Sequence, residues 1–326
     1  MKRGFLVLLM LFASMAVRAS MFVYSADPCT GGDLVSAPEE TLLRCYAPAF
    51  AIDQGERTYN KIGRPQARWK NGAERITVNP DSHVVYVGTH ADKLGTRDVI
   101  QLLYRVHFTK LAFKARVFFE QHRNAGLLTL ITIDAATREP LLITTVYTCG
   151  CYRGTIPTDR FPSAALPKNW PSDRQKVWGK MLPAHVDAPV PGMSRFLIRM
   201  EPSTHRVIDV STVSALPPGE QRSLEILPMA QLHQLPLEGK AGATTSFFHE
   251  SGASKGYVKG AWSGLEGLTL GAAILDLRIG TDKDFGDPAV TGTRFYAMLL
   301  PWNREVSRLD RFNPIMKKLG FRLDRM

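Results

Sequence analysis

Runs of apolar and β-branched residues dominate the middle of the chain and predict strands. The segments that show this pattern most densely are 82–89, 99–108, 127–134 and 140–148. The last two are joined by the polar link AATREP and predict a hairpin, and the first of the pair alternates so little that both its faces are expected to be covered. Further strands are predicted at 195–200, 205–210, 223–227, 244–249 and 292–300.

Helical patterns lie near the two ends of the chain. Ser36, with Pro and then Glu three residues later, has the order of a helix start and predicts a short helix through residue 45. Residues 304–319 have apolar positions at helical spacing, and 265–279 is a weaker helical candidate. The proline-rich segment 156–191 predicts an irregular excursion with a short helix at 172–180. Together these patterns predict a strand-dominated α+β fold, with a large antiparallel sheet or β-sandwich and helices near the N- and C-terminal ends.

The N-terminus has the layout of a secretory signal peptide. Lys2 and Arg3 precede an apolar run over 5–16, and Val17-Arg18-Ala19 follows as a cleavage site. The run is shorter than the roughly 20 apolar residues that a membrane-spanning helix needs. We therefore expect residues 1–19 to be a signal peptide cleaved near Ala19-Ser20, which gives a periplasmic or secreted bacterial protein with no transmembrane span in the mature chain.

The mature chain is expected to be one basic domain. Residues 20–326 are long enough for a single large globular domain, with 260–326 as an alternative sub-domain. The leader contains three of the 41 Lys and Arg residues, so 38 remain against 30 Asp and Glu, a net charge of +8. The excess favours anionic partners. The basic residues are scattered, however, and a solvated face is the commoner meaning of such runs. From export and the basic balance we expect an anionic or amphiphilic envelope component as the partner and no specific nucleic acid. The sequence leaves the oligomeric state open.

Four cysteines are expected to form disulfides in an exported chain. Three pairings are possible, and we favour the local one, Cys29–Cys45 with Cys149–Cys151. The first closes a loop of 17 residues, worth about 3 kcal/mol in chain entropy. In a regular strand the other two would lie near the upper distance limit for a disulfide, but Gly150 lets the chain pinch. The alternatives are a redox pair, whose thiol pKa Arg153 would lower, and half of a soft-metal site.

A cluster of acidic residues in the segment TDKDFGD is a calcium candidate. Asp282, Asp284 and Asp287 supply oxygen ligands at close spacing. The residues at positions 5 and 6 are exchanged relative to an EF-hand loop, so a solvated acidic turn is the main expectation. No cofactor is expected.

Histidines and aromatic residues supply the remaining candidates. His107 lies in an apolar strand, where a hydrogen-bonded core imidazole is usual, whereas His90 with Asp92 lies in a predicted loop and could orient a base. Aromatic side chains could line a binding surface, although packing in the core is their commoner role. These aromatic candidates are Tyr104, Tyr147, Tyr152, Trp170, Trp178, Trp262 and Trp302.

Four segments resemble an uncharacterised group of exported bacterial proteins with a Cys-Gly-Cys-Tyr core motif. They are RCYAPAFAID, YNKIGRP, TTVYTCGCYRG and TGTRFYAMLLPWNRE. The resemblance spans most of the mature chain and implies export and a shared fold, but no activity. Where that group has a His before the cysteine pair, this chain has Tyr147, a departure that weakens a metal or catalytic role for the segment.

These features favour a non-enzymatic cell-envelope protein, a binding or assembly factor. The alternative is a thiol-dependent redox or hydrolytic enzyme centred on Cys149-Gly150-Cys151 and assisted by His107, His90 or Arg153. A cleft that places the cysteine pair beside His107 would favour the enzyme. A buried bridge against the N-terminal segment would favour binding.

Overall fold

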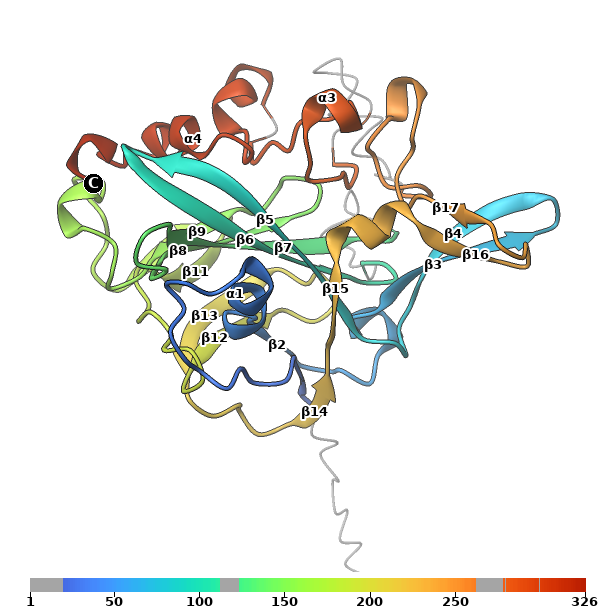
Figure 1. Ribbon diagram of the computed structural model, residues 1–326, viewed down its shortest axis with the longest axis horizontal. Helices are drawn as coiled ribbons and strands as arrows, with labels where there is room; N and C mark the ends of the chain where they lie inside the picture. Colours follow the sequence, from blue (N-terminus) through green and yellow to red (C-terminus); the bar gives the residue numbers. More distant parts are fainter. Residues whose placement is uncertain (1–19, 112–122, 262–277, 279, 299) are drawn as a thin grey trace, which may run out of the picture.

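A six-stranded sheet forms the centre of the molecule (Figure 1). The structure is a computed structural model that describes residues 20–111, 123–261, 278, 280–298 and 300–326; the predicted signal peptide and almost all of the predicted helix 265–279 lie outside these residues. The strand order is β15-β5-β6-β7-β8-β9, antiparallel except for the β15–β5 pair. The strands are β5 (Val84–Leu94), β6 (Arg97–His107), β7 (Gly126–Asp134), β8 (Pro140–Tyr147), β9 (Gly154–Pro157) and β15 (Glu225–Pro228).

A five-stranded sheet covers one face of the central sheet. Its order is β13-β12-β2-β1-β14, with strands β1 (Phe22–Ser25), β2 (Ala49–Ile52), β12 (Arg195–Met200), β13 (Val207–Val213) and β14 (Glu220–Ser223). Apolar side chains of both sheets, such as Phe50 and Tyr104, form one hydrophobic core with helix α1 (Glu39–Cys45). The hydroxyl of Tyr104 donates to the Leu43 carbonyl at 3.0 Å, which fixes α1 to the sheet.

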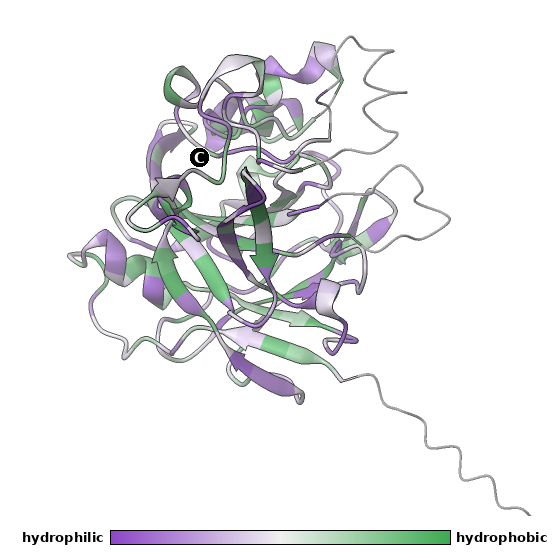
Figure 2. Cartoon of the chain, turned by 90° about the vertical axis from the view of Figure 1, so that its right-hand side faces the viewer, coloured by the Kyte–Doolittle hydropathy of each residue, from purple (hydrophilic) through white to green (hydrophobic). Residues whose placement is uncertain are grey.

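The other face of the central sheet carries the C-terminal segment and a smaller sheet. Helices α3 (Pro288–Thr291) and α4 (Phe312–Lys318) lie above it in Figure 1. The smaller sheet has the order β17-β16-β3-β4, with strands β3 (Arg64–Lys70), β4 (Ala73–Asn79), β16 (Leu235–Glu238) and β17 (Thr244–Thr245). Phe247, Phe312 and Phe321 join Leu130 and Val146 of the sheet in a second core. Apolar residues accordingly gather along the interior strands in Figure 2.

The strand-dominated α+β prediction is confirmed, and so is the β7–β8 hairpin, in which every residue of β7 is buried. The helix predicted at 172–180 is wrong, because this segment is the hairpin of β10 (Arg174–Val177) and β11 (Lys180–Pro183). Trp178 and Gly179 both have positive φ, 48° and 81°, and make its two-residue turn. The strand predicted at 292–300 is also wrong in its described part, which contains only an isolated bridge from Tyr296 to Arg308.

Candidate functional site

The four cysteines form the two local disulfides, Cys29–Cys45 and Cys149–Cys151. The second lies in the turn between β8 and β9, which the Gly150 N–H closes by donating to the Tyr147 carbonyl at 2.7 Å. Gly150 has a φ of 92°, a conformation that favours glycine, and the Cα atoms of the bridged cysteines are 5.6 Å apart. The positive φ of Gly150 therefore lets the chain turn tightly enough to bring Cys149 and Cys151 within bonding distance.

The central sheet separates this bridge from His107. Cys149 is 3% exposed and packs in the core that contains α1 and the five-stranded sheet. The His107 ring instead faces Tyr86 and Phe247, with ring centroids 5.9 and 4.9 Å away, in the core on the other face. The structure therefore does not bring together the groups that the thiol-enzyme hypothesis needs.

A buried charged centre occupies the His107 side of the sheet. Arg105 is fully buried; its Nε donates to His107 Nε2 at 3.2 Å and its Nη1 donates to the Lys283 carbonyl at 2.8 Å. Burial lowers the pKa of Arg105 to about 10, and the charges of Asp284 and Asp282 oppose that fall. Burial and the Arg105 charge hold the pKa of His107 well below its usual value, so the imidazole is neutral. Sequence reasoning missed Arg105, although an arginine inside an apolar strand was a visible signal.

The three calcium candidates are engaged separately. Asp282 accepts a hydrogen bond from Thr148, Asp284 lies 3.2 Å from His233, and Asp287 accepts from the Ala289 N–H at the start of α3. Within the described ranges, no group of three or more His, Cys, Asp and Glu side chains is arranged to hold a metal ion. We therefore do not identify these carboxylates as metal ligands.

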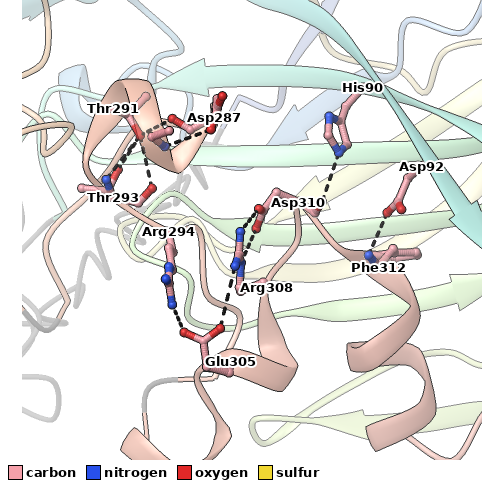
Figure 3. Close-up of polar contacts among 11 residues, drawn as sticks. His90, Asp92, Asp287, Thr291, Thr293, Arg294, Glu305, Arg308, Asp310 and Phe312 are labelled. Carbon is pink, nitrogen blue, oxygen red and sulfur yellow. Dashed lines mark hydrogen bonds and ion pairs between the residues drawn. The ribbon is translucent and has the colours of Figure 1, made fainter.

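His90 and Asp92 fix the C-terminal segment to β5 (Figure 3). His90 Nε2 lies 3.2 Å from the Asp310 carbonyl, and Asp92 accepts a hydrogen bond from the Phe312 N–H at 2.7 Å. The carboxylate of Asp310 is in turn bound by Arg308. The pair predicted to orient a base thus serves as an anchor.

A groove of about 480 Å³ lies between β9, the β10–β11 hairpin and the C-terminal end of the chain. We call it the Arg153 groove. Two tryptophans and two basic residues line it, which brings together the sequence candidates Arg153, Trp170 and Trp178. The full described lining is Arg153, Thr155, Trp170, Gln175, Lys176, Val177, Trp178, Gly179, Leu319 and Phe321.

Arg153 is a cation without a carboxylate partner in the described part of the chain. Its Nη1 donates to Thr155 Oγ1 at 2.8 Å, and its buried Nε has no described hydrogen-bond partner. Burial lowers the pKa of Arg153 to about 10, which still leaves the guanidinium charged at neutral pH. The guanidinium therefore has hydrogen-bonding capacity left for an anion. No described contact joins Arg153 to the cysteine sulfurs, although the sequence suggests that Arg153 lowers the pKa of their thiols.

The two tryptophans of the groove differ in their exposure. Trp170 donates its indole N–H to the Ala184 carbonyl at 3.0 Å and packs against Phe321. Trp178 is 61% exposed at the hairpin turn, and its ring meets the edge of Tyr152 at a centroid distance of 5.7 Å. Arg206 lies over the other aromatic of this pair, 4.0 Å from the Tyr152 centroid. The Trp178 ring is thus held by its contact with Tyr152 and remains largely exposed to solvent.

Comparisons with protein families, with curated proteins and with solved structures found no match. The resemblance to the Cys-Gly-Cys-Tyr group remains a prediction. Of the helices in the described residues, none has the length and apolar character that crossing a bilayer requires. The two disulfides indicate an oxidising environment. The functional argument therefore depends on the site residues alone.

Proposed function

We propose that the protein is an exported binding protein whose Arg153 groove holds an acidic sugar of the cell envelope. The observation that carries the proposal is the Arg153 guanidinium, which lines the groove without a described carboxylate to neutralise it. An incompletely compensated, partly buried cation is costly to a fold. Its presence is explained when a ligand carboxylate or phosphate supplies the missing charge and hydrogen bonds.

The aromatic wall supports a ring-bearing ligand. Trp178 is exposed and lines the same groove as Arg153, and exposed aromatic side chains at a concave site offer a large rigid contact area at low entropic cost. Lys176, also exposed in the groove lining, adds a second positive charge. A ring that carries an acidic group matches both features.

The proposed location rests on separate observations. The predicted signal peptide, the net charge of +8 after its removal and the two disulfides all fit a protein of the cell envelope. Anionic glycans are a ligand class that such a protein would meet.

Isothermal titration calorimetry with trigalacturonate tests the proposal, with its methyl ester as the uncharged control. We expect the charged trimer to bind and the methyl ester to bind at least tenfold more weakly, because only the former presents carboxylates to Arg153. Trp178→Ala is expected to weaken binding at least about tenfold, or about 1.4 kcal/mol. Trp302→Ala is the matched control, because Trp302 is 74% exposed but outside the groove.

Equal binding of the two trimers would contradict the charge argument. Equal losses in the Trp178→Ala and Trp302→Ala variants would contradict the location of the site.

A further inference from the structure

A second pocket, of about 630 Å³, lies between β5, the 3₁₀-helix η4 (Met229–His233) and the segment that contains α3. We call it the His233 pocket. It shares no described lining residue with the Arg153 groove. Leu103, Met229 and Phe285 are among its apolar walls. Its polar lining residues are Thr89, His90, His233, Asp284, Asp287, Thr291 and Asp310. A concave site of this size that combines apolar walls with convergent polar groups suits a small organic molecule.

Two of these polar residues form a close pair. His233 Nε2 lies 3.2 Å from Asp284 Oδ2, and the His233 ring packs on Phe248 at a centroid distance of 5.1 Å. The Asp284 side chain is 2% exposed, whereas that of His233 is 46% exposed. A buried carboxylate behind an accessible imidazole fixes the tautomer and orientation of the ring. With Nε2 turned to the carboxylate, Nδ1 is the nitrogen that can accept a proton.

Charged groups surround the pair, and one buried carboxylate oxygen lacks a hydrogen-bond partner in the described residues. Oδ1 of Asp284 is a buried acceptor without a hydrogen-bond partner among the described residues. The interaction of the His233 ring N–H with the Asp284 carboxylate raises the pKa of His233. Burial and the charge of Arg105 oppose that rise, and the charge of Glu250 adds to it. Buried polar atoms without partners and perturbed titratable groups gather at sites where chemistry or binding occurs.

No described hydroxyl side chain of the pocket is placed as a nucleophile for His233. Thr89 donates to the carboxylate of Glu39, and Thr291 donates to backbone carbonyls of Asp287 and Thr293. Water is therefore the nucleophile that an imidazole base here would activate.

We propose that His233 and Asp284 are an acid–base pair that hydrolyses carboxylic esters with a short apolar acyl chain. His233 takes a proton from water while the water oxygen bonds to the acyl carbon and the π-electrons of the carbonyl move to its oxygen. The C=O bond then re-forms as the ester C–O bond breaks, and the imidazolium returns the proton to the departing alkoxide. The products are a carboxylic acid and an alcohol, and nothing is oxidised or reduced. His233 is the catalytic residue in this scheme, and Asp284 is a positioning residue.

Hydrolysis of p-nitrophenyl acetate and p-nitrophenyl butyrate tests the proposal with the full-length mature protein. His233→Gln is expected to lower kcat/KM at least a hundredfold, the scale of general acid–base catalysis. His249→Gln is the matched control, because His249 is exposed and outside the pocket. A wild-type rate no higher than that of His233→Gln, or an equal loss in the two variants, overturns the proposal.

The pH dependence of hydrolysis distinguishes a positioning role of Asp284 from a purely structural one. In Asp284→Asn the acidic limb of the pH–rate profile is expected to shift to lower pH, because a neutral amide replaces the carboxylate that raises the His233 pKa. An NMR titration of the wild-type protein measures the same property without relying on a variant. A His233 pKa at or below its ordinary value of 6.5 in the wild-type protein overturns the pairing.

Discussion

Replacing Arg153 with methionine should separate stability from binding. A pKa lowered from 12.5 to about 10 corresponds to about 3 kcal/mol of cost for holding the charge. Partial exposure of the side chain reduces this to about 1–2 kcal/mol. Loss of the hydrogen bond to Thr155 Oγ1 costs about 1 kcal/mol. The free energy of unfolding of Arg153→Met is therefore expected to be unchanged or higher by about 1 kcal/mol.

Binding should respond in the opposite direction. A hydrogen bond to a charged group is worth about 1.5–3 kcal/mol, so Arg153→Met should weaken trigalacturonate binding at least about tenfold. Urea unfolding measures the first quantity and calorimetry the second. Arg308→Met is the control, because Arg308 is a buried arginine that is paired with Asp310. Its removal should cost at least about 2 kcal/mol of stability and leave binding unchanged.

Two outcomes would refute the reasoning on Arg153. A free energy of unfolding lowered by more than about 2 kcal/mol in Arg153→Met would mean that the guanidinium stabilises the fold. Retained binding would mean that the groove does not use its charge.

Two further predictions concern the fold. Gly150→Ala should cost at least about 2 kcal/mol more than Gly72→Ala, because both glycines have positive φ but only the added Cβ at 150 would lie 1.7 Å from the Tyr296 carbonyl oxygen; equal midpoints in urea would refute the contact. Burial lowers the pKa of His205 to about 3 and that of His107 well below 6.5. Below pH 6.5 the unfolded chain binds protons at both imidazoles and the folded protein does not, so the free energy of unfolding falls as the pH drops. At pH 5 the loss relative to pH 7 should reach about 4 kcal/mol for the two together, and urea curves that coincide at the two pH values would contradict this.

Local pattern was sufficient where a segment's own residues decide its structure. The β7–β8 hairpin follows from two apolar runs and a short polar link. Of the three possible cysteine pairings the sequence favours the local one, and Gly150 permits the tight turn that its Cys149–Cys151 bridge needs. Asn71-Gly72 at the turn of the β3–β4 hairpin is a strong hairpin signal, but its two strands are polar and lack the apolar runs that predict strands.

The sites depend on tertiary contacts that spacing does not reveal. The 172–180 segment has helix-compatible residues, yet the turn at Trp178-Gly179 and its packing beside β9 make it a hairpin. The sequence suggests Arg153 as a partner of the cysteines, but in the fold Arg153 lines the same groove as Trp170 and Trp178. His233 and Asp284 are brought together by folding from well-separated parts of the chain. No local motif indicates that pair.

A crystal structure of the mature protein with trigalacturonate tests the central proposal most directly. The account predicts a carboxylate of the ligand within about 3 Å of an Arg153 nitrogen, the usual hydrogen-bond distance, and a sugar ring against the face of Trp178. A ligand bound elsewhere, or a saturating titration in solution with an empty Arg153 groove in the crystal, would contradict it.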